Sequence, residues 1–143
     1  QSSSVAAIGI AAHEAAHAMQ DGSGYPPAMM RNSIAPFVEK AGFLVLPLLF
    51  VGILLGRMVL SSVLLNLSLI LFLAIVLFYI VTLPVEFEAS ARAVRYIKEN
   101  GIADAEELEG VRLVLRAAAL TYVIATVMTI LQFLSLFGIL RRK

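Results

Sequence analysis

Long apolar stretches alternate with short polar segments along this chain. Residues 34–56 are apolar apart from Glu39 and Lys40, residues 58–83 carry only scattered serine, asparagine and threonine, and residues 117–140 form a third apolar run. Each run reaches the roughly 20 residues that an α-helix needs to cross the hydrocarbon core of a bilayer. The pattern predicts an all-α membrane protein with three transmembrane helices.

A shorter helix is predicted before the first span. Ser4 is a suitable N-cap for a helix over about residues 5–20, and the glycines and prolines of residues 21–27 end it. With about 16 residues, this helix is shorter than a bilayer crossing requires. We therefore expect it at the membrane surface or packed against other helices.

Turn and capping residues set the remaining boundaries. Gly56 and Arg57 leave room only for a tight helical hairpin between the first two spans. Gly101 ends a helix that follows the second span, and Asp104 with Glu107 forms a capping box for a polar helix before the third span. The helix that follows the second span and the polar helix before the third span would be interfacial helices.

Composition agrees with a membrane protein. Hydrophobic residues make up 60% of the chain and the mean hydropathy is +0.91, above the apolar share of soluble domains. A net charge of +1 without a basic run argues against nucleic-acid binding, and the absence of cysteine excludes disulfides and thiolate ligands. With no repeat or linker, residues 1–143 are predicted to be one membrane-embedded domain. Because the chain opens with Gln1 and lacks a signal peptide, we expect it to be a carboxy-terminal portion.

The two histidines of the chain fall in one HExxH motif, His13-Glu14-Ala15-Ala16-His17. On a helix, residues i and i+4 lie one above the other, so both imidazoles can reach one metal ion while Glu14 flanks it. Zinc binds neutral imidazoles and lowers the pKa of a bound water, so that a neighbouring carboxylate can take its proton. The motif predicts two zinc ligands, His13 and His17, and a general base, Glu14.

A third ligand is needed, and a carboxylate is the simplest donor. Glu86 follows the second span, shares a helix face with Ala89, and has no basic residue at i+4, whereas Glu88 can pair with Arg92. Two spans separate His17 from Glu86, and an even number of crossings returns the chain to the same side. Glu86 is therefore the preferred ligand, although an interfacial carboxylate without metal is also consistent with the pattern.

Three motifs resemble those of the bacterial neutral zinc metallopeptidases that are integral membrane proteins. Residues 5–20 fit V-A-A-x-x-x-A-A-H-E-x-x-H-A-x-Q, residues 83–90 fit L-P-V-E-F-x-A-S, and residues 114–123 fit V-L-R-A-A-A-L-T-Y-V. More distantly, residues 86–90 are similar to the E-[FY]-x-A-D motif of the heat-shock and CAAX-prenyl membrane endopeptidases, with Ser90 in place of aspartate. The resemblance implies one zinc ion in a gluzincin-type site with Glu86 as a ligand. It also implies that Ser90 orients an imidazole.

The expected activity is a zinc-dependent endopeptidase that acts on peptide or membrane-protein substrates near the cytoplasmic membrane surface. Glu14 would take a proton from the attacking water and give it to the leaving amine. Arg116 and Tyr122, at the start of the third span, are candidate donors to the developing oxyanion. Competing explanations are that Arg116 snorkels to the interface and that Tyr122 belongs to an aromatic belt.

Other classes of protein are weighed against this one. An intramembrane protease of the site-two type would supply its third ligand from Leu-Asp-Gly, and no such segment occurs. A transporter would need charged residues deep in the spans, which are absent. A non-catalytic membrane scaffold with an incidental or structural metal site remains the alternative.

An excess of Lys and Arg on the predicted metal side places that side in the cytoplasm of a bacterial inner membrane. Small residues on the spans permit self-association.

Overall fold

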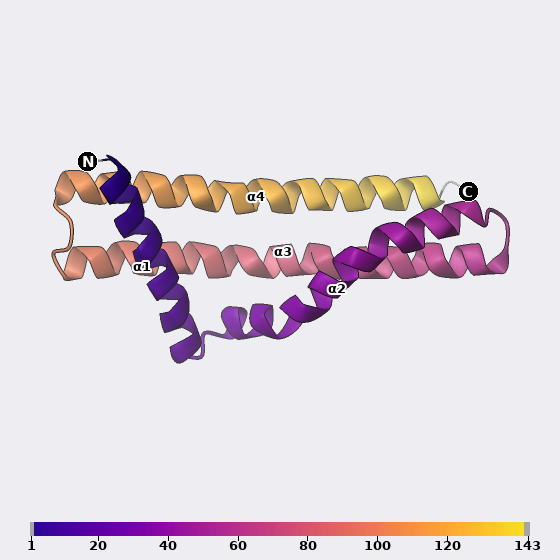
Figure 1. The fold of residues 1–143 in the computed structure, drawn as a ribbon, viewed down its shortest axis with the longest axis horizontal. Coiled ribbons are helices and arrows are strands. Elements are labelled where there is room, and N and C mark those ends of the chain that lie inside the picture. The colour runs from indigo at the N-terminus through magenta and orange to yellow at the C-terminus, as the bar shows by residue number, and fades with distance from the viewer. Residues whose placement is uncertain (1, 142–143) are drawn as a thin grey trace. The chain divides into compact units, whose positions relative to one another are not determined.

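A computed structural model describes residues 2–141, and Figure 1 shows its fold. In that range the regular elements are four helices: α1 (Ser2–Gly22), α2 (Pro26–Leu54), α3 (Val59–Glu99) and α4 (Ala105–Arg141). Helices α2, α3 and α4 are long and apolar enough to cross a membrane. The predicted all-α fold with three spanning helices is confirmed.

The predicted turns and the predicted capping box are present. Helix α1 ends at Gly22, and Gly24 adopts a left-handed φ of 66° in the turn that follows. Gly56 (φ 59°) and Gly101 (φ 61°) do the same after α2 and α3. The backbone N–H of Asp104 donates to Glu107, and that of Glu107 donates to Asp104, at 3.1 and 2.8 Å. This is the predicted capping box.

The helices are longer than the sequence pattern predicted. Helix α1 begins at Ser2, before the expected N-cap Ser4, whose side chain lies outside the described part of the structure. Helix α2 begins at Pro26 rather than near residue 34, because proline suits the first helical turn, where its missing N–H is not needed. Helix α2 ends at Leu54, within two residues of the end near Gly56 that was predicted for the first span.

The polar helices expected beside the second and third spans are not separate elements. Helix α3 continues through Pro84 to Glu99, and α4 runs from Ala105 to Arg141 without a break. Pro84 removes one backbone hydrogen bond but is accompanied by no glycine or capping residue that would end the helix. Each interfacial segment is therefore the extension of a spanning helix.

The chain packs as two compact units, which are described separately. One comprises Gln1–Met30 and Val81–Ile124, and the other comprises Arg31–Ile80 and Ala125–Lys143. That residues 1–143 form a single domain stays a prediction.

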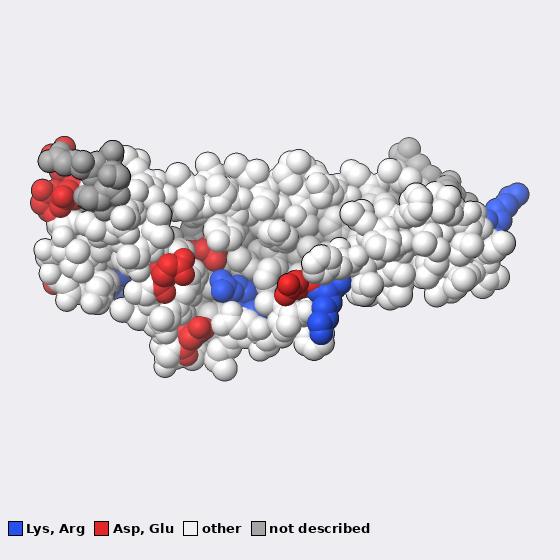
Figure 2. Space-filling model, viewed as in Figure 1, with Lys and Arg blue, Asp and Glu red and all other residues white. Residues whose placement is uncertain are grey.

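The second unit is built around the α2–α3 hairpin. The Ser61 hydroxyl donates to the Gly52 carbonyl at 2.6 Å, and a Cβ at Gly52 would lie 2.8 Å from Leu65. Small residues thus let the two helices approach closely, as is common between helices in bilayers. Large apolar side chains such as Phe43 and Val59 are exposed, and Figure 2 shows little charge over this hairpin. Such a surface suits a lipid environment.

The first unit holds α1 against parts of α3 and α4. Its core is formed by small and branched side chains of these three helices: Ala16, Ala89, Ala93, Ile97, Leu108, Val111 and Leu115. Two glycines permit the close approach of α1 to α4, because a Cβ at Gly9 would lie 3.3 Å from Val111 and one at Gly110 would lie 2.9 Å from Val5. In Figure 1, α1 runs across the adjoining ends of α3 and α4. This packing fixes the position of the HExxH motif.

Candidate metal centre

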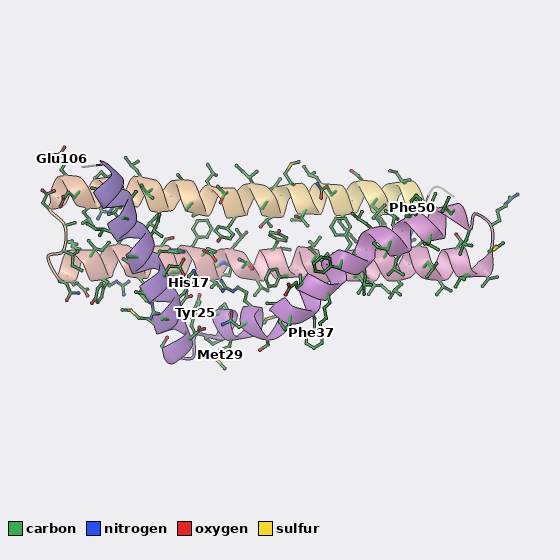
Figure 3. The ribbon with its side chains drawn as sticks, in the orientation of Figure 1. His17, Tyr25, Met29, Phe37, Phe50 and Glu106 are labelled. Carbon is green, nitrogen blue, oxygen red and sulfur yellow. The ribbon has the colours of Figure 1, made fainter. Side chains whose placement is uncertain are left out.

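The structure brings the three predicted ligands together within the first unit. His13 and His17 lie one turn apart on α1 and Glu86 lies on α3, and one ligand atom of each lies within 4.8 Å of the others. Nε2 of His13 is 3.2 Å and Nε2 of His17 is 3.6 Å from the same carboxylate oxygen of Glu86, Oε2. Figure 3 labels His17 at the place where α1 passes α3.

The two distances to Glu86 are close to those between ligands of a tetrahedral metal site. Ligand atoms bound to zinc at about 2.0–2.1 Å are separated from one another by about 3.3 Å. The separation of 3.6 Å between His17 and Glu86 is too long for a hydrogen bond but suits two atoms that share one ion. Glu86 is only 4% exposed, and a carboxylate removed from water needs a cation or hydrogen-bond donors. Two imidazoles and one carboxylate are a donor set that zinc accepts.

Gln20, which the sequence analysis did not single out, connects both helices of the site. Its side chain is fully buried, and its amide nitrogen donates to the Val85 carbonyl at 2.8 Å and to Glu88 at 2.6 Å. Because the Val85 carbonyl can only accept, the amide oxygen of Gln20 must face His17, where it lies 2.9 Å from Nδ1. Nδ1 of His17 therefore carries the proton. Its Nε2 lone pair is left facing Glu86.

Glu88 has the structural role that its spacing predicted. Its Oε1 accepts hydrogen bonds from the guanidinium of Arg92 at 2.9 and 2.7 Å, and the pair follows the expected i,i+4 spacing. Partial burial raises the pKa of Glu88, but hydrogen bonds from Arg92 and Gln20 and the charges of Arg92 and Arg95 outweigh it. The pKa consequently lies below its ordinary value, and the carboxylate stays ionised as an acceptor for Gln20.

Ser90 lies against the other histidine. Its hydroxyl oxygen is 3.4 Å from Nδ1 of His13, near the upper limit of a hydrogen bond. This contact agrees with the imidazole-orienting position that the resemblance implied for Ser90. Both histidines thus direct Nε2 to Glu86 and Nδ1 to a polar side chain.

The structure places the three predicted catalytic residues differently. Glu14 is exposed on α1 directly after His13. Arg116 is exposed on α4 and lines a groove that also contains Ser90. Tyr122 is 37% exposed and does not line that groove. The donor roles of Arg116 and Tyr122 stay predictions.

Comparison with known proteins gives a family match and a curated relative that agree with each other. The model of a family described as putative neutral zinc metallopeptidase matches residues 1–141. The chain is 45% identical over 131 residues to the putative membrane protease YugP of Bacillus subtilis (strain 168), an alignment that covers 92% of this chain and 56% of that protein. The chain therefore spans about half the length of this curated relative. No solved structure gives a significant match.

Proposed function

This chain belongs to the neutral zinc metallopeptidase family, and from that premise we propose that it forms the catalytic part of a membrane-bound, zinc-dependent endopeptidase. The observation that carries the proposal is the convergence of His13, His17 and Glu86 from two helices that are far apart in the sequence. Glu86 is buried, and a cation shared with the two imidazoles would compensate the removal of its carboxylate from water.

We propose that one zinc ion is held by Nε2 of His13, Nε2 of His17 and Oε2 of Glu86, as in gluzincins. Zinc bound there would lower the pKa of a water molecule and polarise a peptide carbonyl. Within the described residues, the cluster offers three protein donors, one fewer than the four of a structural zinc site. A site with a position left for water favours catalysis over a scaffold.

Glu14 is the proposed general base. It follows the ligand His13 directly, and its exposure leaves the carboxylate accessible to water and substrate. Glu14 would take a proton as water attacks the peptide carbonyl and would pass that proton to the leaving amine. Gln20 would hold His17 in the tautomer that leaves Nε2 free.

We further propose that the site faces the cytoplasm. Counted along the sequence, seven basic residues are assigned to the side of the site and four to the other side. The seven are Arg31, Lys40, Arg92, Arg95, Lys98, Arg112 and Arg116, and the four are Arg57, Arg141, Arg142 and Lys143. Basic residues near the ends of spanning helices favour the cytoplasmic side. The substrates would be peptide segments that emerge near the membrane surface.

The test compares the wild-type protein with Glu14→Gln in lipid nanodiscs, using fluorescently labelled casein as the substrate. Glu14→Gln should keep bound zinc but lose hydrolysis by about 100-fold or more, because general acid–base catalysis contributes roughly 10²–10⁴-fold. Glu39→Gln, which neutralises another exposed glutamate, is the matched control and should remain active. A Glu14→Gln protein as active as the wild type would rule out the proposal.

A further inference from the structure

A groove between α3 and α4 lies next to the candidate metal centre. It has a volume of about 490 Å³, within the range of about 300–1,000 Å³ that is typical of ligand sites. Its walls are mainly apolar and include Phe87, Ala91 and Leu115, and two basic residues, Arg112 and Arg116, also line it. An apolar recess with a few charged groups is the usual design of a site that binds one part of a ligand specifically.

Ser90 joins this groove to the candidate metal centre. It lines the groove, and its hydroxyl lies 3.4 Å from Nδ1 of His13. Glu86 precedes Ser90 by one turn on the same helix face. Because an extended peptide advances about 3.3 Å per residue, a side chain that enters the groove would belong to a residue close to the bond held at His13 and Glu86.

The two basic residues of the groove differ in whether an acidic partner neutralises them. Arg112 pairs with Glu109 at 3.1 Å in an exposed i,i+3 contact, and such pairs are weak. Arg116 is exposed and has no ion pair within residues 2–141. Its guanidinium can therefore bind a carboxylate through two parallel hydrogen bonds.

We propose that this groove is the substrate subsite that sets specificity, and that it selects a peptide with an apolar side chain and a carboxylate close to the cleaved bond. The apolar side chain would pack against Phe87, Ala91 and Leu115, and the carboxylate would pair with Arg116. This inference rests on the proposed peptidase function. Continuity with the metal centre through Ser90 favours a peptide over a lipid phosphate as the occupant.

The carboxylate can belong to an acidic side chain or to the carboxyl terminus of the peptide. The test measures binding by fluorescence anisotropy, with the Glu14→Gln protein in phosphatidylcholine nanodiscs. The probes are dansyl-Gly-Gly-Leu-Glu-Gly-amide, its Leu-Gln counterpart, and that counterpart with a free carboxyl terminus. At least one carboxylate-bearing probe should bind about tenfold more tightly than the neutral amide, because a charge-assisted hydrogen bond contributes roughly that factor. The probe with the higher affinity identifies the carboxylate that the groove binds, either that of an acidic side chain or that of the carboxyl terminus.

Three further variants in the Glu14→Gln background locate the effect. Arg116→Gln should abolish the preference for a carboxylate, whereas Arg57→Gln, which removes an arginine outside the groove, should keep it. Ala91→Phe places a bulky ring on an exposed position of the groove wall and should weaken binding of all three probes. Zinc content and gel-filtration profile verify that each variant is folded.

Several outcomes would overturn the inference. The first is equal affinity for the three probes, and the second is a preference for a carboxylate that survives Arg116→Gln. The third is that Arg116→Gln loses binding to phosphatidylglycerol vesicles while its binding of the peptides is unchanged. The last result would assign Arg116 to anionic lipid. Because binding is measured without turnover, failure of this inference is separate from failure of the casein assay. If Arg116 acted only as an oxyanion donor, Arg116→Gln would bind the three probes with the same relative affinities as the protein that keeps Arg116.

Discussion

The side-chain amide of Gln20 on α1 donates to the carboxylate of Glu88 on α3 at 2.6 Å, two residues beyond the candidate ligand Glu86. The same amide nitrogen also donates to the Val85 carbonyl. These two contacts hold the helix that bears both histidines in register with the helix that bears Glu86. The geometry of the candidate metal centre therefore depends on a buried residue that would not itself bind metal.

Replacing Gln20 by leucine should weaken zinc binding. The substitution removes the acceptor that fixes the His17 tautomer and the donors that reach α3, and loss of such supporting contacts typically costs about 10–100-fold in metal affinity. Competition with a chelating dye measures the affinity. Gln132→Leu, which removes an exposed amide in the second unit, is the control and should bind zinc like the wild type. Equal affinity of Gln20→Leu and wild type would show that the contacts of Gln20 are incidental.

Ser90 should matter less for metal affinity than Gln20. Its distance of 3.4 Å to His13 is longer than the 2.9 Å between Gln20 and His17, and hydrogen bonds weaken with length. Ser90→Ala should lower zinc affinity less than tenfold, whereas Ser90→Asp should raise it, because a carboxylate fixes an imidazole more strongly than a hydroxyl does. The same dye competition measures both. A larger loss in Ser90→Ala than in Gln20→Leu would reverse this ranking.

Close packing of α1 on α4 should be needed for the site. A Cβ at Gly110 would lie 2.9 Å from Val5, so Gly110→Leu would force α1 away from α4, and overpacking of this kind costs about 1–3 kcal/mol. We expect a lower Tm and reduced zinc occupancy, measured by differential scanning fluorimetry and metal analysis. Gly138→Leu is the matched control, because a Cβ at Gly138 meets nothing within 4 Å. Similar Tm values for the two variants would contradict this account of the α1 contact.

Much of the fold and the core of the site could be predicted from the sequence. Helical spacing places His13 and His17 on one face, and an even number of spans between His17 and Glu86 allows the three to meet. Glycine and capping residues marked the helix ends near Gly56, Gly101 and Asp104. The spacing and capping signals are local, and the topology depends only on the number of spans, so both can be read from a single sequence.

The contacts of Gln20 could not be predicted, because they depend on how α1 is placed along α3. That placement is set by the packing of Ala16 near Ala89 and Ala93 in the core, which a sequence pattern does not specify. The spacing of three residues between His17 and Gln20 was the available signal, since i and i+3 are neighbours on a helix. The continuity of α3 into its polar segment was also missed. The end of the apolar run at residue 83 shows where a span can leave the bilayer, and it does not show where the helix ends.

The most direct test of the central claim is the zinc content of the purified protein, measured by mass spectrometry for the wild type and for Glu86→Ala. The geometry of His13, His17 and Glu86 predicts one zinc ion per wild-type chain and almost none in Glu86→Ala. Glu99→Ala, which removes an exposed carboxylate at the end of α3 and leaves the three candidate ligands and the Gln20–Glu88 contact in place, should still bind zinc. A wild-type protein that lacks zinc when purified without chelators, or a Glu86→Ala protein that binds as much zinc as the wild type, would contradict the account.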